Sequence, residues 1–81
     1  MQVRVKLFAT FRQYLPAGSK RSATDLEVPP GTRAGELLLQ MGVPMERPEA
    51  IAILINGRHG SIDQVLNEGD VVAAFPTMAG G

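Results

Sequence analysis

The chain has 81 residues, which is enough for one small domain and too few for two domains or a deep catalytic cleft. Its composition, 44% hydrophobic and 20% charged, is typical of a folded globular protein, and the lack of cysteine excludes disulfides, a thiol nucleophile and a cysteine-based zinc site. The net charge is zero, which argues against nucleic-acid binding, because that function needs a concentrated basic surface.

The first strand is predicted from the alternation at the start of the chain. Val3, Val5 and Leu7 alternate with polar residues, as in a strand with one buried face, and we expect this strand over about residues 2–9. The alternation is unlike a signal peptide, and no stretch approaches the length of a membrane span. Together with the lack of cysteine, this predicts a cytoplasmic protein with no membrane partner.

The spacing of apolar residues then changes from two to three or four. Three aromatic residues and one leucine, Phe8, Phe11, Tyr14 and Leu15, would share one side of a short helical turn at residues 10–15. After a polar loop, a second strand is expected at about residues 22–28, and the prolines that follow would end it because proline has no N–H for a ladder.

One long helix is expected over about residues 33–41, between the second and third strands. Thr32 is a favourable N-cap residue, and Gly42 is the expected stop. The apolar residues fall at i, i+3, i+4 and i+7 and form a single stripe, which consists of Ala34, Leu37, Leu38 and Met41.

A continuous aliphatic run, residues 51–55, predicts a third strand covered on both faces. Ile51, Ile53 and Ile55 lie on one face of this strand, and Ala52 and Leu54 lie on the other. One of these two faces must pack on the helix. The face turned away from the helix is either an apolar docking patch or is covered by loops.

Asn56-Gly57, directly after this run, predicts a tight hairpin, because both residues tolerate positive φ. A last strand is expected at residues 71–75, and Pro76 would end its pairing. The residues beyond it reach about 15 to 18 Å when extended. We therefore divide the chain into a folded domain, residues 1–76, and a flexible tail, residues 77–81.

A hairpin, one helix and then further strands is the element order of the β-grasp or ubiquitin-like roll. This α+β fold has a mixed sheet of four to five strands, one main helix packed on one face and, here, a free C-terminal tail. The first and last strands would pair in parallel at the centre of the sheet. That pairing is implied by the fold class and does not follow from the periodicity of the sequence.

Three segments and the Gly80-Gly81 end carry a resemblance to a known family. The segments are residues 5–12 (VKLFATFR), 53–58 (ILINGR) and 66–76 (LNEGDVVAAFP). Together they resemble the small sulfur carriers of molybdopterin and thiamine biosynthesis from end to end. The first segment, with its aromatic turn, is more similar to the small subunit of molybdopterin synthase than to the thiazole carrier.

The resemblance implies a carrier that is not itself an enzyme. In that family an ATP-dependent activating enzyme related to ubiquitin E1 adenylates the terminal carboxylate, here that of Gly81, which then becomes a thiocarboxylate. Activation is needed because an ionised carboxylate is a poor electrophile. The carrier would bind no cofactor, since ATP belongs to the activating partner. The sulfur acceptor would be the large subunit of molybdopterin synthase or an equivalent enzyme.

Five further residues near the end are candidate site residues. Gly80 and Ala79 would thread the tail through a narrow channel, because glycine adopts conformations closed to other residues. Phe75, Pro76 and Met78 are candidates for partner contact, although Phe75 fits the core equally well.

Two residues depart from the usual end of the molybdopterin carriers, in which an aromatic pair precedes two prolines. Ala74 replaces one aromatic residue and Thr77 the second proline. Carriers for the thiamine thiazole, tungsten-cofactor or cysteine pathways, and ubiquitin-like protein modifiers, therefore remain alternatives. His59, Ser61 and Asp63 are interpreted as a polar loop, since their local spacing makes neither a hydrolase triad nor a metal site.

Charge is unevenly distributed along the chain. Residues 1–33 hold six Lys or Arg and two acids, and residues 34–81 hold two Lys or Arg and six acids. This asymmetry is either ordinary solvent-exposed charge or a polar surface that orients a protein partner.

Overall fold

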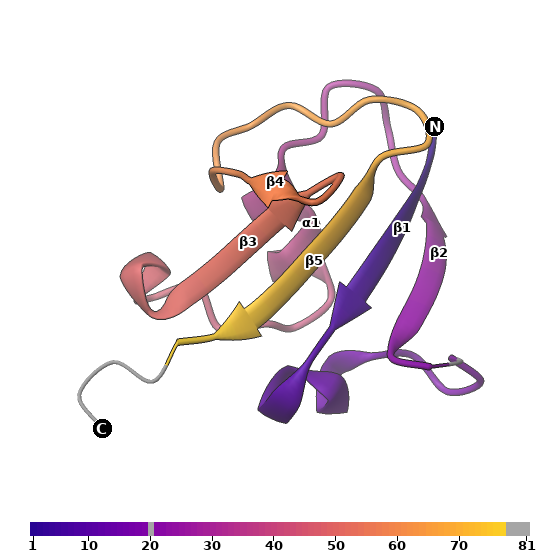
Figure 1. The fold of residues 1–81 in the computed structure, drawn as a ribbon. Helices are drawn as coiled ribbons and strands as arrows, with labels where there is room; N and C mark the ends of the chain where they lie inside the picture. The colour runs from indigo at the N-terminus through magenta and orange to yellow at the C-terminus, as the bar shows by residue number, and fades with distance from the viewer. Residues whose placement is uncertain (20, 78–81) are drawn as a thin grey trace.

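The computed structural model describes residues 1–19 and 21–77, which form one mixed five-stranded sheet with a helix packed on one face (Figure 1). No helix within these ranges is long and apolar enough to cross a membrane. The strands are β1 (Gln2–Leu7), β2 (Ala23–Glu27), β3 (Ile51–Ile55), β4 (Arg58–His59) and β5 (Val71–Pro76). The helices are α1 (Ala34–Gln40) and two 3-10 turns, η1 (Ala9–Tyr14) and η2 (Pro48–Ala50).

The strand order is β2-β1-β5-β3-β4, with β5 at the centre. β1 and β5 are parallel, with Val5 opposite Val72, and all other neighbouring strands are antiparallel. This arrangement confirms the β-grasp roll and its central parallel pair. β5 has a strand on each side up to Ala74, and its last two residues, Phe75 and Pro76, are paired with β3 alone.

The core lies between the sheet and α1. Each fully buried aliphatic side chain stabilises the fold by about 1.5 to 3 kcal/mol. The predicted helix stripe supplies Ala34, Leu37 and Leu38, all at 0% exposure. The strands supply the side chains that face this stripe, which are Val3, Val5, Leu7, Ile53, Ile55, Val72 and Ala74.

The turn after β1 confirms one prediction and overturns another. β1 ends at Leu7 because Ala9 takes a positive φ of 54° and turns the chain into η1, the predicted helical turn. Phe11 is buried and its ring lies 6.2 Å from that of Tyr14. Phe8, by contrast, is 40% exposed and packs elsewhere. The prediction that all three rings share one side is wrong for Phe8.

The start of α1 also differs from the prediction, because Arg33 and not Thr32 is the N-cap residue. The Thr32 hydroxyl donates instead to the carbonyl of Pro29, at 2.7 Å. Main-chain carbonyls of the loop after β4 accept from the first N–H groups of the helix, at 2.9 Å from Ala34 to Gln64. The first two orphan donors of the helix, the N–H groups of Ala34 and Gly35, are therefore satisfied by a distant loop.

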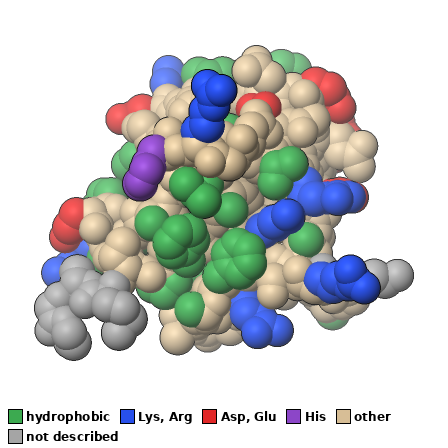
Figure 2. All heavy atoms as spheres, in the orientation of Figure 1, with side chains coloured by type: hydrophobic (Ala, Val, Ile, Leu, Met, Phe, Trp, Pro, Cys, Tyr) green, Lys and Arg blue, Asp and Glu red, His purple; other side chains and the backbone are tan. Residues whose placement is uncertain are grey.

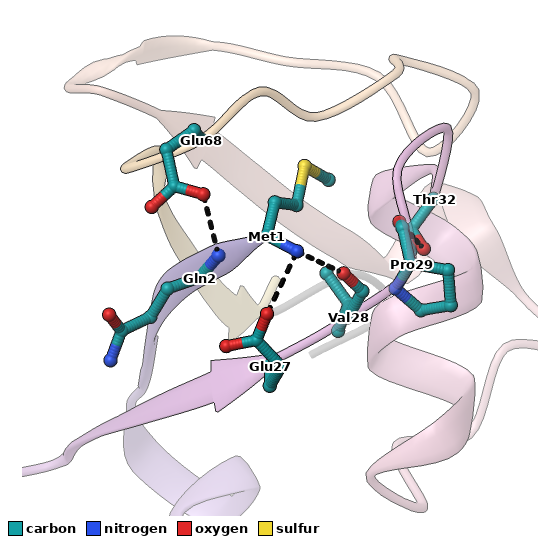
Figure 3. A network of polar contacts seen from close by, with 7 residues as sticks. All are labelled: Met1, Gln2, Glu27, Val28, Pro29, Thr32 and Glu68. Carbon is teal, nitrogen blue, oxygen red and sulfur yellow. Dashed lines mark hydrogen bonds and ion pairs between the residues drawn. The ribbon is translucent and has the colours of Figure 1, made fainter.

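The N-terminus is held between β2 and the loop before β5 (Figure 3). The Met1 ammonium donates to the carbonyl of Val28 at 2.7 Å and pairs with Glu27 at 3.0 Å. The Gln2 N–H donates to the carboxylate of Glu68 at 3.0 Å. These contacts pin the first residues of β1 on both sides.

β3 is a strand, as predicted, but only one of its faces is covered. Ile53 and Ile55 are buried towards α1, whereas Ala52 and Leu54 are half-buried on the opposite face. The expectation that the aliphatic run is covered on both faces is therefore wrong. The hairpin after it is confirmed, since Asn56-Gly57 takes φ values of 54° and 83° and joins β3 to β4.

Candidate functional site

The predicted site lies where the chain leaves β5, and the structure describes only its first part. The predicted activation residue Gly81, the threading residues Gly80 and Ala79, and Met78 lie outside the described residues, so their roles remain predictions. Phe75 and Pro76 are described, and both belong to β5.

The end of β5 is tied to its neighbour one residue further than predicted. Pro76 lies opposite Ile51 in the β3 ladder and does not end the pairing, because the next residue, Thr77, donates its N–H to the carbonyl of Ala50 at 2.9 Å. Pro76 is accommodated because its own N–H is not needed for this contact. The direction in which the chain leaves the sheet is thus set by β3.

Phe75 faces away from α1 and is half-buried. Its ring meets that of Phe8 edge to face, with ring centroids 6.3 Å apart and planes at 76°, a favourable aromatic geometry. The Phe8 N–H donates to the carbonyl of Ala74 at 3.2 Å, which fixes the backbone beneath the pair. The alternative of Phe75 as a core residue is therefore wrong, since it belongs to the exposed side of the sheet.

Phe8 is a residue that the sequence analysis did not include in the site. A signal was present, because the alternation that buries Leu7 places Lys6 and Phe8 on the opposite face. The helical spacing to Phe11 and Tyr14 obscured it. Phe8 now lies beside the end of β5, with 40% of its surface exposed.

Side chains of β3 and β5, together with Phe8 directly after β1, form one apolar surface on this face of the sheet, which we call the open-face patch. Figure 2 shows hydrophobic side chains gathered over the middle of the sheet, with basic side chains to one side. The strand register places Ala52 beside Phe75 and Leu54 beside Ala73. The open-face patch consists of Phe8, Ala52, Leu54, Val71, Ala73 and Phe75.

The predicted division of the third strand into two faces is thus confirmed, and in the described part of the chain no loop or helix covers the open-face patch. The uncovered face is the one that carries Ala52 and Leu54, a choice that the alternation left open. An apolar surface rimmed by charge is typical of a protein interaction site.

Charged residues border the open-face patch on the β1 side. Arg4 donates two hydrogen bonds to Asp25, at 2.8 and 3.2 Å. The hydrogen bond from Arg4 lowers the pKa of Asp25, with desolvation opposing it. Since the pKa is lowered in the folded state, the pair adds stability above the ordinary aspartate pKa of about 3.9 and loses it as the pH falls. Solvent screens this exposed pair, so its main effect is to hold Arg4 in place.

Other chemistry is not apparent in residues 1–19 and 21–77. They contain no group of three or more His, Asp or Glu that could hold a metal ion. The Ser61 hydroxyl accepts from the N–H of Asp63 at 3.1 Å, and no hydrogen bond among these residues joins it to His59. The three residues form a polar loop and strand end, as interpreted from the sequence.

The mixed sheet, the single helix across it and the chain leaving from the central strand define a ubiquitin-like protein of the β-grasp class. Within this class, residues 1–80 match the family model described as Mut7-C ubiquitin, and the chain belongs to this family. A comparison of the sequence with curated proteins gives no match.

Solved structures of similar fold include carriers and modifiers. A putative molybdopterin converting factor, subunit 1, from Pyrococcus furiosus is 32% identical over 95% of this chain and 98% of its own, with a TM-score of 0.68. The SAMP1 protein from Haloferax volcanii is 25% identical over 100% of both chains, with a TM-score of 0.71. These likenesses place the chain among the ubiquitin-like sulfur carriers and modifiers.

A third structure shares the fold alone. It comes from the complex of subunits 1 and 2 of the molybdopterin-converting factor from Helicobacter pylori, and it is 20% identical over 100% of both chains, with a TM-score of 0.59.

Proposed function

We propose that this protein is a sulfur carrier for molybdopterin biosynthesis, with Gly81 as the residue that carries the sulfur. The observation that carries the proposal is the 32% identity, over 95% of the chain, to the Pyrococcus furiosus protein described as a putative molybdopterin converting factor, subunit 1. The protein itself would catalyse no reaction.

The chemistry requires two steps at the carboxylate of Gly81. A carboxylate oxygen attacks the α-phosphorus of ATP, and pyrophosphate leaves with the electrons of the broken P–O bond. Hydrosulfide then attacks the acyl carbon, displaces AMP and loses its proton, which leaves a thiocarboxylate. ATP would be bound by the activating enzyme, because this sequence has no phosphate-binding glycine motif.

The geometry of the described residues supports this role. β5 is paired with β1 up to Ala74 and with β3 up to Pro76, and the Thr77 N–H donates to the carbonyl of Ala50. The point at which the tail begins is therefore fixed relative to the sheet. Residues 78–81 would reach about 13 to 14 Å if extended. A docking surface close to the start of the tail, the open-face patch, therefore limits where Gly81 can be delivered.

Two partners follow from the proposal. The first is an adenylating enzyme related to ubiquitin E1, and the second is a sulfur acceptor equivalent to the large subunit of molybdopterin synthase. In the Helicobacter pylori complex, subunit 1 of the converting factor is bound to subunit 2. The open-face patch is the surface that we assign to both partners in turn, since each must receive the same tail.

The experiment that tests the proposal uses intact mass. The protein is incubated with a candidate activating enzyme, ATP and a sulfur donor, and we expect the mass to rise by the exchange of one oxygen for sulfur. The matched control carries one extra alanine after Gly81 and should not react, because its terminal carboxylate is displaced by a residue. If the unextended protein never gains sulfur, or if the extended control gains it equally, the carrier proposal is wrong.

The second candidate function is that of a ubiquitin-like protein modifier. It is favoured by the likeness to SAMP1 of Haloferax volcanii, at 25% identity over the whole of both chains. Conjugation would join Gly81 to a substrate lysine through an isopeptide bond, which appears in cell extracts as adducts of higher mass. A variant that lacks Gly80 and Gly81 is the control, since it cannot form these adducts.

A further inference from the structure

β2 is an edge strand with an unpaired outer side. Its pairing with β1 uses every second residue, since Leu7 donates its N–H to Ser22 at 2.9 Å and Val28 donates to Met1 at 2.8 Å. Antiparallel pairing alternates, so residues 23, 25 and 27 direct their N–H and C=O groups away from β1. In the part of the chain that the structure describes, these main-chain groups have no hydrogen-bond partner.

The opposite edge of the sheet offers much less. β4 has only two residues, Arg58–His59, and short edge strands are one way in which proteins prevent edge-to-edge pairing. β2 has five residues, and both of its acidic side chains are already held, Asp25 by Arg4 and Glu27 by the N-terminus. β2 is therefore the longer edge of the sheet.

An apolar hollow of about 330 Å³ lies beside β2 on the side of α1. Leu26 lines it from β2 and Val28 from the residue that follows β2. Met41, at the C-cap of α1, and Tyr14 of η1 line the other side. Side chains of a strand added to β2 would point alternately to the two faces of the sheet. Those on the α1 side would enter this hollow, which suits aliphatic residues.

A second hollow, of about 470 Å³, lies beside β2 on the open side of the sheet, and its charge is positive. Arg4, Lys6 and Arg21 line it together with Asp25. Arg4 is paired with Asp25, but among the described residues no acidic group lies within 4.0 Å of the charged groups of Lys6 or Arg21. Side chains that an added strand directs to this side would gain most from a negative charge.

We propose that the β2 edge binds an extended segment of a partner protein as a sixth strand, in which aliphatic residues alternate with acidic ones. The aliphatic side chains fill the hollow beside Leu26 and Met41, and the acidic ones face Lys6 and Arg21. Main-chain hydrogen bonds to residues 23, 25 and 27 supply affinity, as in other cases of strand addition. β1 separates this site from β5, so it is distinct from the open-face patch and does not depend on the carrier chemistry.

The first test uses a labelled peptide that alternates valine and aspartate over about seven residues, a typical strand length. We expect saturable binding to the full chain by fluorescence anisotropy, with amide shifts at residues 23, 25 and 27 in NMR spectra. The control peptide has lysine in place of aspartate and should bind at least about tenfold more weakly. Equal binding of both peptides, no saturation, or shifts confined to β3 and β5 would overturn the proposal.

A pair of variants then isolates the main-chain contribution. Asp25→Pro removes an outward N–H without removing a bond to β1, and Thr24 before it is already extended, as proline requires. Asp25→Ala loses the same ion pair with Arg4 but keeps the N–H. We expect the proline variant to bind the peptide about tenfold more weakly than the alanine variant; equal affinities would contradict strand addition.

A second pair covers the case in which Asp25→Pro does not fold. Lys6→Gln removes a cation from the open hollow, and Arg58→Gln removes one from the far edge of the sheet. Only Lys6→Gln should weaken binding of the acidic peptide. Light scattering of the unmodified chain is the last control. A dimer that Asp25→Pro disrupts would show that the occupant is a second copy of this chain, and the proposal would then be wrong.

Discussion

Asp70 joins two turns that are far apart in the sequence. It is 8% exposed, and its carboxylate accepts from the Asn56 side chain at 2.9 Å and from the Asn67 N–H at 2.8 Å. The Asn56 side chain in turn accepts from the Val71 N–H at 2.9 Å. One carboxylate thus connects the β3–β4 hairpin to the start of the central strand β5.

Replacing Asp70 by alanine should therefore be costly. Asp70→Ala leaves two donors without their partner at a nearly buried position, and we expect the free energy of unfolding to fall by about 1 to 3 kcal/mol. Urea denaturation measures this change. The control is Asp63→Ala, because Asp63 is exposed and its side chain makes no hydrogen bond to a described residue; its effect should stay within about 0.5 kcal/mol. Similar losses in both variants would show that the network contributes little.

Phe8 is the residue that best separates binding from folding. Phe8→Ala removes a ring that is 40% exposed and touches Phe75, so we expect a loss of stability of about 1 kcal/mol or less. Exposed aromatic residues at the centre of an interface often dominate binding, and affinity for the activating enzyme should fall about tenfold or more. Calorimetric titration measures the affinity. Leu39→Ala is the matched control, since Leu39 is 62% exposed on α1, on the other side of the sheet; an equal effect would exclude the open-face patch as the docking surface.

At the scale of elements, α1 ends where the sequence predicts. Gly42 takes a φ of 98°, and the Gly42 N–H donates to the carbonyl of Leu39 at 3.0 Å. Only glycine adopts this conformation without strain, so the stop signal is encoded locally. The chain then turns so that the Val43 side chain is fully buried in the core.

Gly42→Ala tests this end of α1. A side chain at positive φ is strained, and we expect a loss of about 1 kcal/mol in the free energy of unfolding, read as a lower thermal midpoint. Gln40→Ala, in the last turn of the same helix, introduces the same residue at an exposed position with ordinary helical geometry and should change little. If the two variants have the same thermal midpoint, the positive φ at residue 42 does not destabilise the alanine variant.

The sequence predicts the elements better than their contacts. The alternation of Val3, Val5 and Leu7 and the stripe of α1 depend on local periodicity, and both proved correct. The capping of α1 by the Gln64 carbonyl could not be predicted, because it joins residues that only the folded chain brings together. Thr32 has a side chain suited to an N-cap, but its hydroxyl donates to the carbonyl of Pro29 and does not cap the helix.

At the site, too, local periodicity predicts which residues share a face but not which residues the fold brings together. The face of Ala52 and Leu54 follows from alternation, but which face α1 covers depends on the order of strands in the sheet. Phe8 was assigned to the wrong side because two periodicities meet at one residue, and only the positive φ of Ala9 decides between them. Ala74, one of the two departures from the usual carrier ending, is fully buried towards α1. An aromatic ring at that position would need a different core, so this departure reflects packing beneath the sheet.

At the scale of the whole molecule, the core and the proposed chemistry occupy different parts of the chain. Every buried residue of the core lies between Val3 and Ala74, and β5 is paired with β1 up to Ala74 and with β3 up to Pro76. Folding should therefore not depend on the residues that follow Thr77. The proposed function, by contrast, depends on them entirely.

Truncation after Thr77 tests this separation. Because the truncated chain keeps the core and the Thr77 contact to Ala50, we expect its thermal midpoint to stay within about 2 °C of that of the full chain. Binding to the activating enzyme through the open-face patch should persist in weaker form, while the gain of sulfur in the mass assay should disappear. Phe8→Ala is the reciprocal control, since it keeps the tail and should lower affinity without removing the reactive carboxylate. A large drop in the thermal midpoint on truncation would show that the tail stabilises the fold, and sulfur gained by the truncated chain would place the reactive group outside the tail.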